Sequence, residues 1–385
     1  MEDLFSYSEF VGKLTVQEIV LLATFASIML VRFCFDLFVY GRVVFAKDKR
    51  IKNSKPSFSV LMVIRNEENN LKNNLPALLN TKYLTNEVIV VDDFSQDSSY
   101  ATLGLIREKH KTLQISNLSQ EMRYSSKQAL NIGLKAAKYD WIIQTKPSVI
   151  VYPNDWISSF ADKIENNINL VVGYSNIASK KGLMNLLYKV ELFFQQFQSF
   201  AFIGCGCGYV VEEDNIALLR QKYFEMGGFA GEMDDAYMNL ERLINKVIKR
   251  KYTALNLSSE GVIHKNRFIN AKKYKDLVIK SIHIKRKLKF LIRTVLLIDK
   301  LSKLFLVPLS IIAIFLFPEI ILTSSIIILS KVILHMFIIY QVLNSLNEKK
   351  LFISSLIYEQ IIPYYKLIYI RNYFSSLRKR KWNNN

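Results

Sequence analysis

The sequence predicts an α/β domain with a doubly wound, mostly parallel sheet, flanked by transmembrane helices. Short apolar runs rich in β-branched residues alternate with helix-length stretches between residues 58 and 145, and this alternation is typical of a parallel sheet covered by helices. Long apolar segments lie near both ends of the chain. Half of the 385 residues are hydrophobic and the formal net charge is +19. This combination favours a membrane protein with cationic cytoplasmic faces over a nucleic-acid-binding protein.

The first predicted membrane span covers residues 19–39, which are predominantly apolar and long enough to cross a bilayer. Arg32 and Asp36 lie four residues apart on one helical face, where they can pair with each other or with another helix. The segment before the span lacks the features of a removable signal peptide. Residues 42–55 are basic, whereas residues 1–13 carry more acid than base. The positive-inside rule therefore places the N-terminus outside and the following domain in the cytoplasm.

The globular part is expected to begin near residue 56. We predict strands at 58–64, 88–91, 113–115, 141–145 and 170–173, and helices at 69–80, 98–110, 126–137, 182–200 and 234–249. The three cysteines include two that are two residues apart in a Gly-Cys-Gly-Cys-Gly turn at 204–208. They match neither a disulfide framework nor a zinc site.

The chain becomes basic after about residue 268. Lysines and arginines interleaved with apolar residues favour a helix on the membrane surface, with its lysines facing anionic headgroups; a solvent-exposed basic face is the alternative. We expect residues 304–317 and 320–343 to form a hairpin of two spans, 351–370 a re-entrant or interfacial helix, and 378–382 a basic cytoplasmic anchor. The expected units are a transmembrane anchor with a basic linker (1–53), an α/β domain (54–267), a surface helix (268–303), and a C-terminal transmembrane region with an interfacial helix and tail (304–385).

Four motifs follow one another through the predicted α/β domain. Two are strands that end in acidic turns, at 60–69 and 87–97; the third is a lysine ahead of an Ala-Leu-Asn helix, at 126–138; the fourth is a Gly-Gly-Phe turn at 223–230. In order and spacing they resemble the family 2 glycosyltransferases. The resemblance implies a GT-A fold with a mixed, mostly parallel sheet and a nucleotide-sugar donor. It also implies transfer of the sugar to a lipid-linked or cell-envelope glycan acceptor.

A nucleotide sugar carries a base, a ribose and a diphosphate, and the strand-end residues suit these groups. Ligands bind beyond the carboxyl ends of parallel strands, where Asp93, Asp92 and Glu67 can accept hydrogen bonds from ribose hydroxyls and base NH groups. Arg65 and Lys127 can offset the diphosphate charge. Turn and helix capping is the alternative role for the aspartates, and we favour it for Asp97.

The sequence departs from the family where a metal is expected. Family members carry an Asp-X-Asp pair after the fourth strand, which holds a divalent metal on the diphosphate. Here that position reads Lys146-Pro-Ser148, so we predict no metal ligands. Lys146 can offset phosphate charge as a point cation, although a lost metal site is the simpler interpretation.

The resemblance also implies an acidic cluster after the Gly-Gly-Phe turn, with one carboxylate acting as general base on the acceptor hydroxyl. Glu232, Asp234 and Asp235 are the candidates, and the register does not choose between them. An acidic cap on the following helix is the alternative. The Gln-X-X-Arg-Trp signature of processive synthases is absent; residues 285–287, Lys-Arg-Lys, lie near its expected place and can hold phosphate or lipid headgroups.

Two functions from different classes remain. The first is an active sugar transferase, multi-pass in the cell inner (plasma) membrane, with membrane lipid around its spans. The second is a catalytically inactive relative that serves as a scaffold or subunit of an envelope assembly, reached by protein partners through the transmembrane helices. The missing acid pair favours the second, whereas Asp93, Lys127 and the acidic cluster favour the first. Nucleic-acid binding is not expected, because the lysines concentrate beside apolar segments.

Overall fold

A computed structural model describes residues 14–45, 56–81, 83, 86–121, 126–150, 152–165, 167–233, 235, 237–317 and 321–382. The globular part contains a seven-stranded sheet with the order β3-β2-β1-β4-β7-β5-β8. Its strands are β1 (Phe58–Ile64), β2 (Asn86–Asp92), β3 (Leu113–Asn117), β4 (Trp141–Thr145), β5 (Leu170–Gly173), β7 (Ile216–Leu219) and β8 (Thr253–Asn256). A second, two-stranded sheet pairs β6 (Ser175–Ile177) with β9 (Ile263–Lys265).

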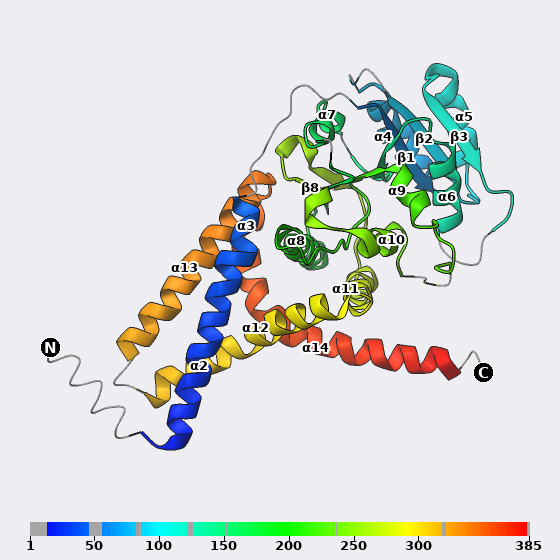
Figure 1. The fold of residues 1–385 in the computed structure, drawn as a ribbon. Helices are drawn as coiled ribbons and strands as arrows, with labels where there is room; N and C mark the ends of the chain where they lie inside the picture. Colours follow the sequence, from blue (N-terminus) through cyan, green and yellow to red (C-terminus); the bar gives the residue numbers. More distant parts are fainter. Residues whose placement is uncertain are drawn as a thin grey trace.

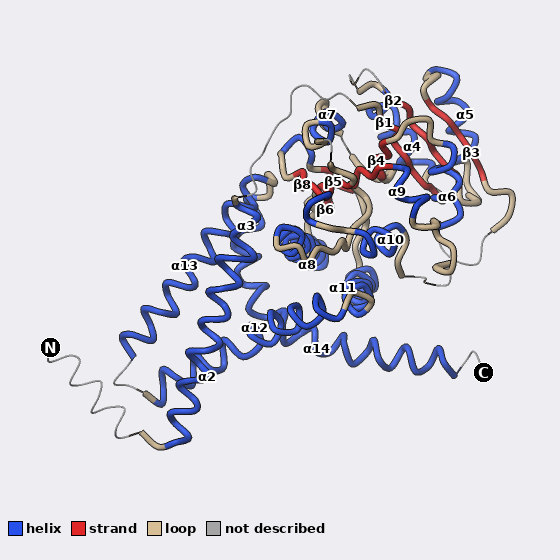
Figure 2. The backbone as a smooth tube through the Cα atoms, in the orientation of Figure 1, coloured by secondary structure: helices blue, strands red, loops and turns tan. Residues whose placement is uncertain are grey.

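The strand directions confirm the predicted mixed, mostly parallel sheet. Strands β1 to β4 are mutually parallel where they pair, as are β5 and β8, whereas β7 runs antiparallel to both of its neighbours, β4 and β5. All seven residues of β1 are buried, as expected for a central strand that is covered on both faces. Figure 2 shows the strands gathered inside the globular part with helices around them.

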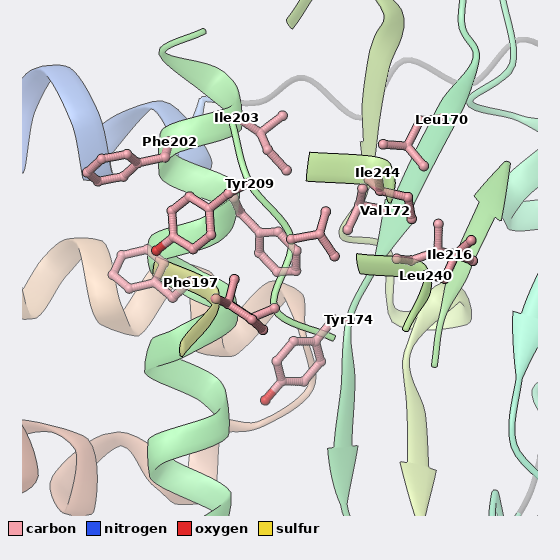
Figure 3. Close-up of a cluster of buried hydrophobic side chains, with 14 of the residues drawn as sticks. Leu170, Val172, Tyr174, Phe197, Phe202, Ile203, Tyr209, Ile216, Leu240 and Ile244 are labelled. Atoms are coloured by element: carbon pink, nitrogen blue, oxygen red, sulfur yellow. The ribbon is translucent and has the colours of Figure 1, made fainter. Parts of the chain in front are cut away.

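Helices cover the sheet because side chains alternate between its two faces along each strand. One face packs on α4 (Glu68–Leu79), α5 (Ser99–Lys109) and α7 (Trp156–Ala161); the other packs on α6 (Lys127–Ala136), α8 (Leu183–Gly204) and α10 (Leu240–Val247). Figure 3 shows part of the core on this second face, a cluster that includes Phe197 of α8, Val172 of β5 and Ile216 of β7. A short helix, α9 (Arg220–Glu225), and the 3-10 turns η2 (Arg250–Tyr252) and η3 (Ser259–Gly261) complete this part.

Long helices project from the globular part. They are α2 (Val16–Cys34), the π-helix η1 (Phe35–Tyr40), α3 (Gly41–Val44), α11 (Ala271–Arg286), α12 (Phe290–Leu316), α13 (Ile321–Ser345), a 3-10 turn η5 (Lys349–Leu351) and α14 (Phe352–Trp382). Figure 1 shows α2, α3 and α13 leaving the globular part in one direction, whereas α14 runs to the C-terminus in another.

Two segments among the described helices are long and apolar enough to cross a membrane: Val16–Val44 and Ile321–Ser345. Only 22% and 33% of their most apolar windows are buried, and their exposed faces carry large apolar side chains such as Phe38 and Phe337. Exposed apolar surface on this scale is unusual for a water-soluble monomer. The helix α12, expected to supply a span at 304–317, carries charged residues from Arg293 to Lys303 and does not meet the same criterion.

Several helix boundaries differ from those predicted, among them the start of α12 at Phe290 and the end of α8 at Gly204. Two of the differences have a cause visible in the structure. The helix expected at 234–249 begins only at Leu240, whose backbone N–H donates to the carboxylate of Glu213 at 2.9 Å; an acid that is distant in sequence therefore caps it. The helix expected at 351–370 continues from Phe352 to Trp382 without a break at Pro363. A proline removes a single backbone donor, and contacts with α8, α11, α12 and α13 support the helix.

A buried charged network joins the projecting helices. The Arg32 guanidinium lies 3.2 Å from Asp36 and 2.8 Å from Asp299 of α12. His335 of α13 lies 2.9 Å from Asp36 through its Nδ1 and also contacts Glu359 of α14 through its Nε2. The pairing of Arg32 with Asp36 and with another helix is confirmed. Because buried charges are costly unless they are paired, this network favours one arrangement of the four helices.

Candidate functional site

The loops that follow β1 and β2 lie together and are joined by hydrogen bonds. Strands β1 and β2 pair in register up to Ile64 and Asp92, and the Asp93 N–H continues the ladder to the Ile64 carbonyl at 2.9 Å. Asn66, which adopts a left-handed backbone (φ 55°), accepts a hydrogen bond from the Gln96 N–H at 2.7 Å through its side-chain oxygen. The two loops, residues 65–67 and 93–98, therefore form one connected surface at the carboxyl ends of adjacent strands, as expected. We call this surface the donor ledge.

The aspartates of the second loop have separate roles. Asp92 accepts hydrogen bonds from the backbone N–H and the hydroxyl of Ser95, so it caps the turn. Asp97 accepts from the backbone N–H groups of Ser99 and Glu68 at 3.0 and 3.3 Å. It thereby supports the starts of both α5 and α4, which agrees with the capping role favoured for it.

Asp92 and Asp97 are thus occupied by turn and cap hydrogen bonds, whereas the described residues show no such hydrogen bond to the Asp93 carboxylate. It is 7% exposed. Burial raises the pKa of Asp93, and the positive charge of Arg65 opposes that rise; the carboxylates of Asp92 and Glu121 raise the pKa further, and Lys146 lowers it. A partly desolvated carboxylate beside two cations is suited to accept hydrogen bonds from a polar ligand.

Arg65 and Glu67, at the end of β1, are also partly engaged. Arg65 forms an ion pair with Glu121, and the two side chains are 41% and 58% exposed. Such a surface pair contributes at most about 1 kcal/mol, so Arg65 is free to exchange Glu121 for a phosphate. The Glu67 carboxylate accepts from the amide of Asn70, and its own N–H donates to the Ser99 hydroxyl at 2.9 Å.

Lys146 directly follows β4 and belongs to an ionic cluster that the sequence did not predict. Its ammonium lies 3.6 Å from Glu213 and 3.7 Å from Asp214. Lys265 pairs with Asp214 at 2.6 Å and with Glu212 at 3.2 Å. An isolated antiparallel β-bridge between Val149 and Lys265 places β9 beside the loop that follows β4. We call these residues, together with Arg267, the ionic cluster: Lys146, Lys265, Arg267, Glu212, Glu213 and Asp214.

The ionic cluster holds three cations against three carboxylates. Burial raises the pKa of Asp214, but Lys265, Lys146 and Arg267 outweigh it and hold this pKa far below its usual range. Burial lowers the pKa of Lys146, and Asp214 and Glu213 outweigh it to give a net rise. Lys146 is therefore a fixed cation at the strand end. Two carboxylates already oppose its charge.

The residues around Lys146 do not fit a divalent metal. The ammonium occupies the position of the first expected aspartate, and repulsion by this fixed cation opposes an adjacent metal ion. Ser148, at the position of the second, has a buried hydroxyl without a hydrogen-bond partner. Hard divalent ions require several oxygen ligands that converge on one point, and the described part of the chain contains no group of three or more His, Cys, Asp or Glu residues that could hold one.

The acidic loop before α10 forms a second group. Glu232 lies 2.8 Å from Arg242 and 2.5 Å from Lys246. Asp235 accepts from the Tyr237 N–H and lies 3.0 Å from the Nε2 atom of His283. Burial raises the pKa of Asp235, but His283 and the Tyr237 N–H outweigh it and lower this pKa to about 2. Asp234 lies outside the described residues.

Lys127 belongs to this second group. Its side chain is fully buried, and its ammonium donates to the backbone carbonyls of Glu232, at 2.7 Å, and of Met233 and Asp235. In the structure Lys127 thus holds the acidic loop. Direct contact with a diphosphate, as the sequence suggested, would require the loop to release it.

His283 was missed by the sequence analysis. It comes from α11, and its Nδ1 atom lies 3.0 Å from the Tyr373 hydroxyl of α14. The sequence offered little indication of its role. His283 is one of only four histidines, but it lies in a basic segment that we assigned to the membrane surface. The structure instead places it against an acid of the α/β domain. Both ring nitrogens of His283 are therefore engaged, one by Asp235 and one by Tyr373, so the imidazole fixes the position of the Asp235 carboxylate.

The fold and the strand-end acids agree with the resemblance noted in the sequence. Residues 59–225 match the family model described as glycosyl transferase family 2. The match covers β1 to α9, including the loops that carry Asp93 and Lys146. It supports a family 2 glycosyltransferase and a glycosyltransferase-like central domain.

Curated relatives match the same region. Poly-beta-1,6-N-acetyl-D-glucosamine synthase of Staphylococcus aureus (strain MSSA476) is 26% identical over 167 residues, which is 40% of this chain and 39% of the relative. The protein of the same name from Staphylococcus epidermidis is 22% identical over 153 residues, covering 40% and 36%. The chain therefore matches about two fifths of the length of these relatives.

A solved structure shares the fold more widely. The mannosyltransferase PcManGT from Pyrobaculum calidifontis, in complex with GDP-Man and Mn²⁺, superposes with a TM-score of 0.51 at 16% identity, covering 88% of this chain and 98% of that one. At this identity the likeness shows the fold alone.

Proposed function

We propose that this chain is a membrane-anchored glycosyltransferase, with its α/β domain at the cytoplasmic face. It moves a sugar from a nucleotide-sugar donor to a lipid-linked or cell-envelope glycan acceptor. The observation that carries the proposal is Asp93, a buried carboxylate beside Arg65 on the ledge at the ends of β1 and β2. The family match covers this ledge, and the curated relatives are named as synthases of an acetylglucosamine polymer.

In the proposed reaction, the acceptor hydroxyl oxygen bonds to the anomeric carbon of the sugar. The bond from that carbon to the diphosphate breaks, and the nucleoside diphosphate leaves with the electron pair. Asp93 holds the base or ribose, while Arg65 and Lys146 offset charge on the departing diphosphate. The Asp235 carboxylate takes the proton of the acceptor hydroxyl, and His283 orients this carboxylate through its Nε2 atom; we call these two residues the proton-transfer pair. Glu232 is a weaker candidate for this role, because both of its oxygens already face cations.

We further propose that donor binding needs no divalent metal. Lys146 occupies the place of a metal ligand and supplies a permanent positive charge there, as a point cation beside the diphosphate. The surrounding carboxylates keep it protonated, since they raise its pKa. The structure that shares the fold is a complex with GDP-Man and Mn²⁺, so metal dependence is the property in which this chain is expected to differ.

The membrane part of the proposal rests on the two exposed apolar segments, Val16–Val44 and Ile321–Ser345. Their ends meet the globular part at α3 and η5 (Figure 1). We propose that α12 supplies the third span, at 304–317, so that the domain and the C-terminal tail lie on the same side of the membrane. The basic residues of 42–55 and of the tail then favour the cytoplasmic side for both. The proposed units keep the expected limits: 1–53, 54–267, 268–303 and 304–385.

Calorimetry on the full chain in phosphatidylcholine nanodiscs tests the proposal. UDP-GlcNAc and GDP-mannose are titrated with Mn²⁺ and with EDTA. We expect one donor class to bind with the same affinity in both conditions, and Asp93→Ala to abolish the heat. Asp155→Ala is the matched control, because Asp155 is exposed and makes no side-chain cap hydrogen bond.

Absence of binding by both donors in both conditions would overturn the transferase proposal and leave the inactive-subunit alternative. Binding that appears only with Mn²⁺ would overturn the metal-independent part alone.

A further inference from the structure

A cavity of about 520 Å³ lies where α8, α11, α12 and α14 meet. Apolar side chains form much of its wall, including Phe194 and Phe197 of α8, Leu296 of α12, and Ile362 and Phe374 of α14. This region lies between the α/β domain and the projecting helices (Figure 1). No role in the proposed donor site accounts for it.

Cations surround the cavity. Six of its lining residues are basic: Lys285, Arg286, Arg293, Lys300, Lys303 and Lys366. Two lining residues are acidic, and both already have partners within the protein. Asp299 lies 2.8 Å from Arg32, and Glu359 lies 3.0 Å from Lys303. The lining therefore carries an excess of positive charge over negative charge.

Four of these cations lack a carboxylate partner among the described residues: Lys285, Arg286, Arg293 and Lys300. Lys285 donates instead to the neutral side-chain oxygen of Gln198 at 2.6 Å. Burial, reinforced by the positive charge of Lys366, lowers the pKa of Lys285 to about 7, against the opposing effect of Glu191 and Asp299. The cavity thus holds a desolvated ammonium that an anion would stabilise.

Arg286 is oriented at the same cavity. Its guanidinium lies 5.2 Å from the ring centre of Tyr373 and 4.7 Å from that of Phe374. Cation–π contacts hold the guanidinium plane without consuming its N–H donors. A planar fork held in this way is suited to bind a phosphate through two hydrogen bonds.

The cavity adjoins the proposed proton-transfer pair. Lys285 and His283 lie on the same helix, α11, and Tyr373 contacts both His283 and Arg286. Arg286 follows His283 by three residues and therefore shares its face of α11, so a ligand head at Arg286 would lie about one helical turn from His283, which faces Asp235. The apolar wall continues onto α12, whose outer surface exposes Leu297 and Leu301, so an attached hydrocarbon chain has an apolar path out.

We propose that this cavity binds the phosphate head of a membrane lipid that is the acceptor of the transferred sugar. Lys285, Arg286, Arg293 and Lys300 neutralise the phosphate, and the aromatic and aliphatic wall holds the first part of the lipid chain. The acceptor role rests on the proposed function, whereas the binding of the phosphate-headed lipid does not.

The test measures lipid binding to the full chain in phosphatidylcholine nanodiscs by calorimetry. The probes are farnesyl monophosphate, farnesol, inorganic phosphate and short-chain phosphatidic acid. The variants are Lys285→Met and the double substitution Arg293→Gln/Lys300→Gln. Lys275→Met is the matched control, because Lys275 is an exposed lysine of α11 that does not line the cavity.

We expect farnesyl monophosphate to bind more tightly than farnesol or inorganic phosphate. Each cavity variant should weaken it by roughly tenfold to a hundredfold, as loss of a charge-assisted contact does, and Lys275→Met should leave it unchanged. Equal binding of farnesol, or equal loss in Lys275→Met, would overturn the phosphate site. Equal or tighter binding of phosphatidic acid would overturn the acceptor assignment and leave a general phospholipid site.

Donor binding separates this inference from the proposed function. Lys285→Met should retain the nucleotide-sugar affinity of the unaltered chain, since Lys285 is not part of the donor ledge, and should retain the same thermal unfolding midpoint or a higher one. Retained donor binding with lost lipid binding supports the inference. If the unaltered chain binds farnesyl monophosphate but no nucleotide sugar, the transferase proposal is overturned and the proposed lipid site remains.

Discussion

Replacement of Asp214 by asparagine tests how the ionic cluster holds the carboxyl end of β4. Asp214 lies 2.6 Å from Lys265, 3.7 Å from Lys146 and 3.9 Å from Arg267. Asparagine keeps the shape and can still offer one oxygen to Lys265, so the change removes mainly the negative charge. Three cations, of which Lys265 is buried and Lys146 and Arg267 are partly exposed, would then face the two carboxylates of Glu212 and Glu213.

The expected loss follows from those distances. Removal of one partner from a buried ion pair costs about 3–5 kcal/mol. Lys265 would keep Glu212 at 3.2 Å, and Lys146 would keep Glu213 at 3.6 Å, so the lower end applies. We therefore expect Asp214→Asn to lower the free energy of unfolding of the α/β domain by about 3 kcal/mol.

The loss should depend on pH in a defined direction. The folded pKa of Asp214 is depressed, so its contribution to stability is present above the unfolded pKa of about 3.9 and is lost as the pH falls below it. The difference between the two proteins should be full at neutral pH and should shrink in acid. Tryptophan fluorescence during urea unfolding measures it, because Trp141 and Trp156 are buried in this domain.

A double-mutant cycle with Lys265→Met decides between charge balance and simple packing. If the cluster acts through charge, Asp214→Asn/Lys265→Met should be less destabilised than the sum of the single variants. Asp155→Asn is the exposed control. A loss below about 1 kcal/mol, in the range of a surface pair, that also stays constant between about pH 5 and pH 2 would refute the reasoning.

Three further predictions follow from other contacts. Asp93→Asn should weaken nucleotide-sugar binding by at least roughly tenfold, as loss of a charged acceptor does. Because the pKa of Asp93 is raised, acid should protonate this carboxylate, and so weaken binding to the unaltered chain, at a higher pH than for an ordinary aspartate. Calorimetry across pH would contradict this if affinity were flat. Lys127→Met should release the three carbonyls that it binds and destabilise the acidic loop by about 2–3 kcal/mol; hydrogen exchange of 232–240 that matched the unaltered chain would argue against it. Arg32→Met should leave Asp36 and Asp299 uncompensated and cost about 3–5 kcal/mol, seen as a lower thermal midpoint in detergent; an unchanged midpoint would show that the network does not hold the helices.

Contiguous residues by themselves determined much of the α/β domain. The strand expected at 58–64 and the one at 141–145 have the observed limits, because a run of apolar, β-branched residues between polar turns encodes a buried strand locally. Asp97 was assigned correctly to capping, since its partners lie at neighbouring helix starts. The pairing of Arg32 with Asp36 follows from four-residue helical spacing alone.

Partners distant in sequence escaped the prediction. Lys146 meets Glu213 and Asp214, and Lys127 meets the carbonyls of the acidic loop more than a hundred residues later. Neither contact leaves a periodic signal in the chain. The boundaries of α10 and α14 differ from the prediction for the same reason, because a remote carboxylate caps α10 and packing on four helices supports α14 past Pro363.

The sequence alone thus determined the fold class, the strand-end ledge and the substitution of Lys146-Pro-Ser148 for the acid pair. Only the tertiary structure decided what those residues face. It placed Lys146 in a balanced ionic cluster, His283 against Asp235, and the basic residues of α11 and α12 around one cavity. The physical reason is that hydrophobic periodicity is a property of neighbouring residues. The partner of a charged side chain is instead decided by the packing of helices and strands that lie far apart in the sequence.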